Sequence, residues 1–153
     1  MSVEKVKDYF KKYNIEDRII ELTNEIATVA DAAKYLECDE DMIAKTLSFN
    51  VDGKTILIVA SGNTRIDNAK YKQEFGTKAR MLSYEEVEQR VGHKVGGVCP
   101  FAINDDVEVY LDKSLKKHKY IYPACGSTNS AIKLSLEELE KYSNYKKWVD
   151  VGK

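Results

Sequence analysis

Two strand-like segments joined by Asp52-Gly53 constrain the fold of this chain more than any other feature. An Asp-Gly pair between apolar and β-branched runs is the typical turn of a two-residue β-hairpin, and here it joins residues 46–51 to residues 55–60. The second run, Thr55-Ile-Leu-Ile-Val-Ala60, is apolar almost throughout, as in strands buried on both faces. The hairpin therefore predicts the centre of a buried sheet.

The other predicted elements mix single helices with strands and do not alternate regularly. Helices are expected where apolar residues recur at helical spacing behind a capping residue, and strands where β-branched and apolar residues cluster. This order favours an α+β fold with a mixed, partly closed, barrel-like sheet and flanking helices, rather than a doubly wound sheet. The expected helices are residues 1–14, 28–36 (capped by Thr28, with Asp31 as its partner), 39–43 (capped by Asp39), 67–75 (ended by Gly76), and one each after Ser83 (with Glu86) and Ser135 (with Glu138). The expected strands are residues 18–22, 46–51, 55–60, 79–82, 107–111, 120–125, 131–134 and 148–151.

Length and charge exclude several classes of protein. A chain of 153 residues is expected to form one domain, residues 1–153. Its 24 basic and 25 acidic residues lack the basic excess typical of non-specific nucleic-acid binding, so we expect no DNA partner and only local contacts with RNA. With no apolar run of membrane-spanning length and no signal-peptide core, we expect no membrane partner and a cytoplasmic location. The three widely spaced cysteines are interpreted as reduced thiols.

The segment Gly92–Pro100 holds three of the eight glycines and one of the two prolines. A Gly-Gly pair permits unusual backbone angles and close approach of another molecule, and Pro100 then stiffens the chain. These properties suit a loop whose backbone N–H groups converge on a ligand or an oxyanion. An ordinary surface turn has the same composition, and both interpretations stay open at this point.

Cys99 and His93 lie in the same segment and could form a nucleophile and its base. Their six-residue separation does not by itself bring the side chains together, and a free cysteine is usually a small buried hydrophobe. A Cys99-dependent ester or amide hydrolase is therefore kept as a minor alternative. The histidines and cysteines lack the spacing of metal ligands, so we expect no metal site.

Lys45 stands among apolar neighbours, where a short helix is expected to become the first strand of the hairpin. Such a lysine either extends its ammonium to solvent or holds an anion, and composition favours the first. Residues 28–47 imitate a helix-turn-helix, but their second part runs directly into a strand, so we interpret them as support for the sheet. The basic run Lys113–Lys119 fits a solvated helix face as well as a phosphate contact.

Together these pieces resemble the YbaK/EbsC family, the editing domains related to the insertion domain of bacterial prolyl-tRNA synthetase. Order and spacing agree from about residue 28 to residue 142, which is most of the chain. The matching segments are Thr28-Val-Ala-Asp-Ala-Ala, Ile43-Ala-Lys45-Thr-Leu, Val95-Gly-Gly-Val-Cys-Pro-Phe101, and Gly126-Ser127 leading into Ile132-Lys-Leu134 and Leu139.

The resemblance implies a trans-acting aminoacyl-tRNA deacylase that needs no cofactor. It implies hydrolysis of the ester of mischarged tRNA, with Cys-tRNA(Pro) or Ala-tRNA(Pro) as expected substrates. The implied partners are the tRNA 3′ end and a prolyl-tRNA synthetase. Near-neutral charge predicts weak affinity of the isolated protein for tRNA, so we expect the synthetase to deliver the substrate. A non-catalytic module that binds tRNA or a synthetase is the alternative. The implied site has Lys45, Thr28, Gly126 and Ser127 binding the substrate and the backbone of Gly96, Gly97, Val98, Cys99 and Pro100 stabilising the oxyanion.

Two positions depart from the family's pattern. Members commonly carry Ser-Pro-x-Gly at the end of the loop, where this chain has Cys99-Pro-Phe-Ala102. Some also carry an aspartate at the position of Ala131. These differences leave the amino acid and the tRNA that are edited undetermined, because small pockets discriminate weakly between similar side chains.

Overall fold

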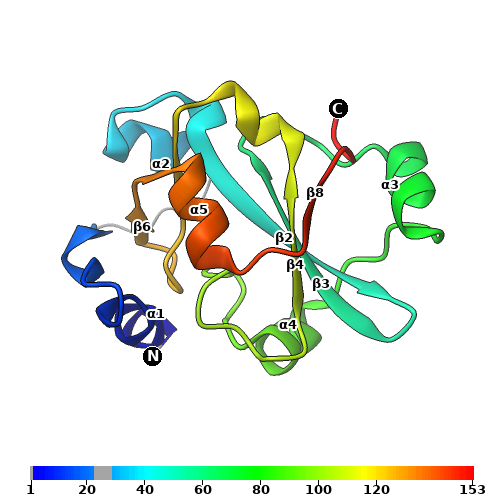
Figure 1. Ribbon diagram of the computed structural model, residues 1–153, viewed down its shortest axis with the longest axis horizontal. Helices are drawn as coiled ribbons and strands as arrows, with labels where there is room; N and C mark the ends of the chain where they lie inside the picture. The colour runs from blue at the N-terminus through cyan, green and yellow to red at the C-terminus, as the bar shows by residue number, and fades with distance from the viewer. Residues whose placement is uncertain (1, 23–28) are drawn as a thin grey trace.

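The computed structural model describes residues 2–22 and 29–153, which form a curled sheet with helices on both of its faces (Figure 1). The strand order in the larger sheet is β7-β5-β2-β3-β4-β8, and β1 and β6 form a small second sheet. The helices are α1 (Ser2–Lys11), α2 (Val29–Leu36), α3 (Asn68–Phe75), α4 (Tyr84–Val91) and α5 (Leu136–Ser143), with 3-10 turns η1 (Glu16–Arg18), η2 (Glu40–Met42) and η3 (Lys113–Lys117). The strands are β1 (Ile19–Glu21), β2 (Ile43–Val51), β3 (Lys54–Ser61), β4 (Glu108–Asp112), β5 (Tyr120–Pro123), β6 (Ser130–Ile132), β7 (Leu134–Ser135) and β8 (Lys147–Val149).

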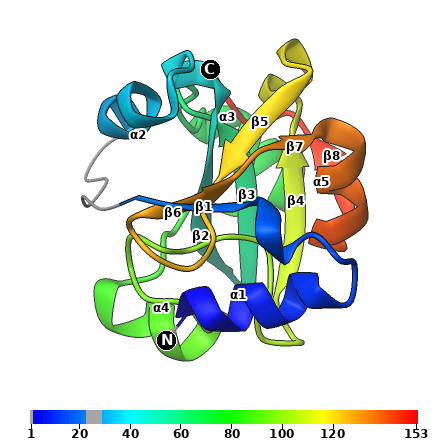
Figure 2. The ribbon, with the colours of Figure 1, turned by 90° about the vertical axis from the view of Figure 1, so that its left-hand side faces the viewer.

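Strand directions confirm the predicted α+β fold with a mixed, partly closed sheet. β2 pairs with β3 in antiparallel fashion, whereas β2–β5, β3–β4 and β4–β8 are parallel pairs. Figure 2 shows the small sheet of β1 and β6 lying across the open side of the larger sheet, near α1. The predicted edge strand near the C-terminus is β8, at the end of the larger sheet.

The predicted hairpin forms the centre of this sheet. Val51 pairs with Lys54, so Asp52 and Gly53 make a two-residue turn, and both have the positive φ angles (51° and 87°) that such a turn requires. All β3 residues after Lys54 are buried, as the apolar run predicted. The Asn50 side chain also accepts a hydrogen bond from the Gly53 N–H, at 2.9 Å.

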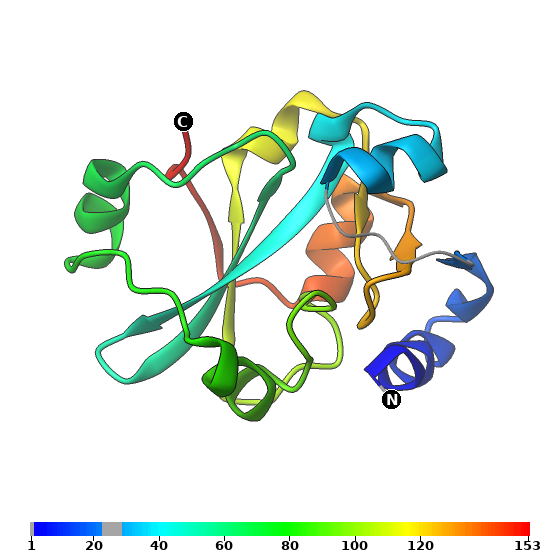
Figure 3. The ribbon, with the colours of Figure 1, turned by 180° about the vertical axis from the view of Figure 1, so that it is seen from behind.

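Apolar side chains cover the sheet on both faces. On one face, Phe10 of α1 packs against Phe101, with ring centroids 4.8 Å apart, in the larger cluster that also includes Leu139 of α5. On the other face, Tyr71 of α3 packs on Phe49 at 5.1 Å. Figure 3, seen from behind, shows α3 on the opposite side of the sheet from α1 and α5.

Local capping chemistry was predicted correctly at several helix ends. Ser83 and Ser135 each form a complete capping box with the glutamate three residues later. Asp67 caps α3, which ends at Gly76 in the left-handed conformation. The proposed cap of residues 28–36 involves Thr28, which lies outside the described residues.

Four predictions need correction. The strand expected at residues 131–134 is divided between β6 and β7, which belong to different sheets because β6 pairs with β1 and β7 pairs with β5. The strand expected at residues 79–82 is reduced to a single bridge between Met81 and Phe49, because only two backbone hydrogen bonds join it to β2. Asp39 precedes η2 but makes no side-chain capping bond. β2 begins at Ile43, so Lys45 lies within the strand and pairs with Ala60.

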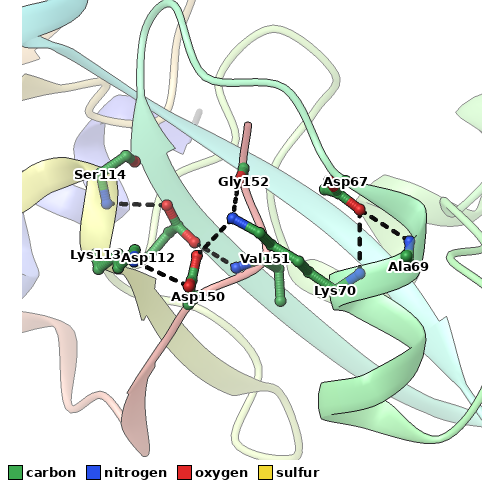
Figure 4. A network of polar contacts seen from close by, with 9 residues as sticks. All are labelled: Asp67, Ala69, Lys70, Asp112, Lys113, Ser114, Asp150, Val151 and Gly152. Carbon is green, nitrogen blue, oxygen red and sulfur yellow. Dashed lines mark hydrogen bonds and ion pairs between the residues drawn. The ribbon is translucent and has the colours of Figure 1, made fainter.

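The C-terminal segment is fastened to the sheet by the buried carboxylate of Asp112 (Figure 4). Its two oxygens accept hydrogen bonds from the backbone N–H groups of Ser114 (3.0 Å) and Val151 (2.9 Å), and the residue is only 1% exposed. Lys70 of α3 adds a hydrogen bond to the Gly152 carbonyl, at 2.9 Å. One buried side chain thus joins η3, β4 and the C-terminal segment.

We expect Asp112→Asn to lower the free energy of unfolding by about 1–3 kcal/mol, because an amide NH₂ cannot accept from either N–H and leaves one buried donor unpaired. Asp150→Asn is the matched control, since its ion pairs with Lys70 and Lys113 are solvent-exposed and should contribute much less. Urea unfolding of the three proteins measures both effects. Equal midpoints for the Asp112 variant and the wild type would contradict this role.

Candidate functional site

A cleft with a volume of about 450 Å³ runs along the outer edge of β2. Its walls come from α2, the beginning of α4, the turn at residues 95–98 and the turn at residues 127–131. Segments far apart in the sequence therefore meet here. A volume of this size suits a small-molecule ligand or group.

Lys45 lies in this cleft as the third residue of β2. Burial lowers the pKa of its ammonium below the ordinary lysine value, and the positive charge of Arg65 acts in the same direction. Its ammonium makes no hydrogen bond or ion pair with any residue that the structure describes. A partly buried cation without a partner is suited to holding an anion.

The glycine loop forms a tight turn at the wall of the cleft. The Gly97 N–H donates to the Lys94 carbonyl at 3.0 Å, and Gly96 has a φ of +94°, as the third residue of a type II turn requires. A Cβ on Gly97 would lie 2.5 Å from the backbone of Gly126, and one on Gly96 would lie 2.6 Å from the Thr128 side chain. Both glycines are thus needed where the two turns touch.

In this geometry, only some residues of the predicted oxyanion loop can offer a backbone N–H group to a ligand. The N–H of Gly97 is used within the turn and is not free for a ligand. Gly96 and Val98 line the cleft, and their N–H groups have no acceptor in the described part of the chain. Cys99 and Pro100 are buried and lie behind the cleft wall, where Pro100 fixes the direction of the chain.

The Gly126-Ser127 turn packs directly against the glycine loop and continues the wall of the cleft. Gly126 adopts a φ of +92°, and Ser127 lines the cleft. The Ser127 hydroxyl donates to the Asn129 side chain at 2.9 Å and lies 2.6 Å from the Ser130 hydroxyl. Asn129 in turn exchanges two hydrogen bonds with Leu22, each 2.8 Å long. The turn is held rigidly, but Thr28, the remaining predicted substrate contact, lies outside the described residues.

Cys99 and His93 do meet, although their sequence separation did not require it. The Cys99 sulfur lies 3.5 Å from His93 Nε2, and both side chains are fully buried. Burial raises the pKa of the thiol to about 12 and lowers the pKa of the imidazole. Nε2 also lies 2.6 Å from the Phe101 carbonyl, to which it donates a hydrogen bond. An inaccessible thiol with a raised pKa is a poor nucleophile.

Sequence reasoning missed several residues of the cleft. Met81 (57% exposed) and Tyr84 (76% exposed) stand at its rim, near the C-terminal half of β2. Thr46 lines it between Lys45 and Leu47, and its hydroxyl oxygen is buried without a hydrogen-bond partner among the described residues. The aromatic residue directly after the Ser83 cap was the available signal for Tyr84, whereas nothing local marked Thr46.

Residues 2–22 and 29–153 present neither a cluster of metal ligands nor a membrane-spanning helix. They contain no group of three or more His, Cys, Asp or Glu side chains arranged to hold a metal ion. No helix in these residues has both the length and the apolar character to cross a membrane. Within the basic run, Lys113 pairs with Asp150 at 2.9 Å, and Lys117 and His118 lie 3.0 and 2.7 Å from Asp41.

Comparison with known proteins identifies the family. The sequence pattern of the aminoacyl-tRNA editing domain matches residues 23–142, which include β2, the glycine loop and the Gly126-Ser127 turn. The chain belongs to the aminoacyl-tRNA editing domain family. The resemblance inferred from the sequence motifs is thereby confirmed at the level of the family.

Individual relatives cover the chain to different extents. The uncharacterized protein YwhH of Bacillus subtilis (strain 168) is 49% identical over 154 aligned residues, covering 100% of this chain and 98% of that protein. The proline–tRNA ligase of Bacillus cereus (strain AH820) is 24% identical over 102 residues, covering 66% of this chain. The match covers only 18% of the ligase.

Solved structures show that the whole fold recurs. A crystal structure described as a candidate trans-editing enzyme for prolyl-tRNA synthetase superimposes with a TM-score of 0.90 at 24% identity, covering 99% of this chain and 97% of that chain. The hypothetical protein APE2540 superimposes with a TM-score of 0.85 at 27% identity, covering 97% and 99% of the two chains. These similarities establish the editing-domain architecture of the chain.

The burial of Cys99 predicts its resistance to alkylation. In native protein at pH 8, iodoacetamide should label the partly exposed Cys38 first and leave Cys99 and Cys125 unmodified, because both are buried and their thiols have raised pKa values. Mass spectrometry of tryptic peptides measures the labelled sites, with denatured protein as the control in which all three react. Rapid labelling of native Cys99 would revive the thiol-hydrolase interpretation.

Proposed function

We propose that this protein is a trans-acting deacylase that hydrolyses the ester of mischarged tRNA, with Cys-tRNA(Pro) or Ala-tRNA(Pro) as substrates. The observation that carries the proposal is the convergence, in one cleft of an editing-domain fold, of a lysine and a turn whose ammonium and N–H groups have no partner among the described residues. The ligand of such a cleft is the tRNA 3′ end, which presents an adenosine, a phosphate and an aminoacyl ester together.

Lys45 is proposed to hold the phosphate of the 3′-terminal nucleotide. An ammonium is a compact point charge suited to phosphate, and its partial burial strengthens the attraction by lowering the local dielectric. The N–H groups of Gly96 and Val98 are proposed to stabilise the negative charge that develops on the ester oxygen. The ammonium and the two N–H groups together orient the substrate, and this proximity supplies much of the reduction in the activation free energy of hydrolysis.

Apolar side chains influence which amino acid the cleft accepts. Ala44, Ala124 and Ala131 line it near the parallel pairing of β2 with β5. Ala131 is only 5% exposed and places a methyl group where some relatives carry an aspartate. This lining favours uncharged side chains, which include those of alanine and cysteine.

The described lining of the cleft provides hydroxyl groups and the Lys45 ammonium as its reactive side-chain groups. None of the described residues that line it is an aspartate, glutamate, histidine or cysteine. We therefore propose that a water molecule attacks the ester carbonyl, the bond to the ribose oxygen breaks, and a proton passes to that oxygen to regenerate the tRNA hydroxyl. The same observation favours the second candidate, a module that binds tRNA or a synthetase without turnover.

A panel of mischarged tRNAs tests the proposal. Release of labelled amino acid by the wild type is expected, and Lys45→Ala should lower kcat/KM about 10- to 100-fold, the value of a charge-assisted contact. Lys72→Ala, on the exposed surface of α3, is the matched control and should leave the rate unchanged. Binding of tRNA without turnover on any substrate would establish the non-catalytic module instead.

The lowered pKa of Lys45 predicts how nucleotide binding depends on pH. The charged ammonium holds the phosphate, so affinity for adenosine 5′-monophosphate should be full at neutral pH and fall as the pH rises through the lowered pKa, below the ordinary value of 10.5. Calorimetric titration between pH 7 and pH 10 measures this. Lys45→Gln should remove the pH dependence, whereas an unchanged profile in that variant would assign it to another group.

A further inference from the structure

The outer edge of β2 contains a gap in its hydrogen-bonded ladder, and the gap lies in the cleft. Toward the N-terminus, Ala44 pairs with Pro123 of β5. Toward the C-terminus, the Leu82 N–H donates to the Ser48 carbonyl at 3.1 Å, and the Asn50 N–H donates to the Arg80 carbonyl at 2.8 Å. Between these two pairings, neither backbone group of Thr46 has a partner at this edge among the described residues.

The register of the hairpin shows where these groups point. In an antiparallel pair, every second residue exchanges both backbone hydrogen bonds with its partner strand and the residues between face outward. Val51 and Lys54 close the two-residue turn, so the odd-numbered residues of β2 bond to β3. The outward bonds of Ser48 and Asn50 agree with this alternation. The N–H and C=O of Thr46 therefore both face the cleft side of the strand.

We propose that the aminoacyl group of the substrate fills this gap by pairing with the backbone of Thr46 as a one-residue strand. The α-amino group would donate to the Thr46 carbonyl, and the ester carbonyl would accept from the Thr46 N–H. This inference rests on the proposed function and specifies how the same cleft holds the amino acid. Addition of a strand to an open edge is a general mode of peptide recognition.

The pairing has consequences for the substrate. Residues directly opposite each other in an antiparallel pair direct their side chains to the same face, so an L-amino acid would place its side chain beside that of Thr46. Ala44 occupies that face and is buried in the larger core cluster. A D-amino acid would direct its side chain to the other face. The backbone of Thr46 would thus select the L configuration and a small side chain.

The Thr46 side chain provides a control for the backbone contact. Its hydroxyl oxygen is buried and has no partner among the described residues, so Thr46→Val should preserve binding and keep or raise the midpoint of unfolding. Replacing Thr46 by its α-hydroxy acid changes the peptide bond between Lys45 and Thr46 to an ester, which removes the Thr46 N–H and weakens the Lys45 carbonyl as an acceptor toward β3. The same replacement at Leu47, whose N–H bonds to β3, should instead destabilise the hairpin.

The probe is adenosine that carries L-alanine on its 3′ position through a non-hydrolysable amide, measured by calorimetry. The α-hydroxy replacement at Thr46 should weaken binding about tenfold, and so should D-alanine or a propionyl group, which lacks the α-amino group, in place of L-alanine. Thr46→Val should bind within about threefold of the wild type. Equal losses in Thr46→Val and the backbone variant would place the contact on the side chain and overturn the inference.

Deacylation separates failure of this inference from failure of the proposed function. A wild type that deacylates mischarged tRNA, together with a backbone variant of equal kcat/KM and equal affinity for the probe, would overturn the Thr46 contact alone. A wild type that neither deacylates nor binds the probe would overturn both. Folding of each variant is checked by its unfolding midpoint, so that a loss of affinity is not a loss of structure.

Discussion

The antiparallel pairing of β2 with β3 is the constraint on which the rest of the structure depends. Because side chains and backbone groups alternate along a strand, the turn at Asp52-Gly53 determines which face and which edge each residue of β2 presents. A slip by one residue would send Phe49 from its contact with Tyr71 to the opposite face, and it would turn the backbone of Thr46 toward β3. The core and the cleft are thus set by the same register.

Close contact between two turns is the second requirement of the cleft. Gly97 touches the backbone of Gly126 at a distance that admits no side chain, and this contact holds the wall formed by Gly96 and Val98. Farther along, Ala102 adopts a φ of 55°, in a position where members of the family commonly carry glycine. The left-handed conformation is retained here at the cost of strain on a non-glycine residue. The loop therefore accepts alanine at residue 102, although the positive φ at this position favours glycine.

Local chemistry made much of the fold predictable. The two capping boxes, the Asp67 cap and the Asp-Gly turn each depend on residues within four positions of one another, so the sequence pattern contains the whole interaction. The ladder gap at Thr46 was not predictable, because it depends on where β5 stops and where residues 80–82 begin to pair. Likewise, the six-residue separation of Cys99 and His93 left open whether their side chains meet, and only the folded core shows that they do and that both are sealed from solvent.

The chemistry of the cleft follows from what its backbone offers. None of the described residues that line the cleft carries a carboxylate, an imidazole or a thiol, so the proposed hydrolysis relies on orientation and on backbone N–H donors for its stabilisation. Such donors act without reorganising, because each belongs to an element already held by packing: Thr46 by the hairpin, and Gly96 and Val98 by the contact with Gly126. A catalytic site built from backbone depends on the fold more than on individual side chains. This is consistent with the recurrence of the fold in structures of 24% and 27% identity.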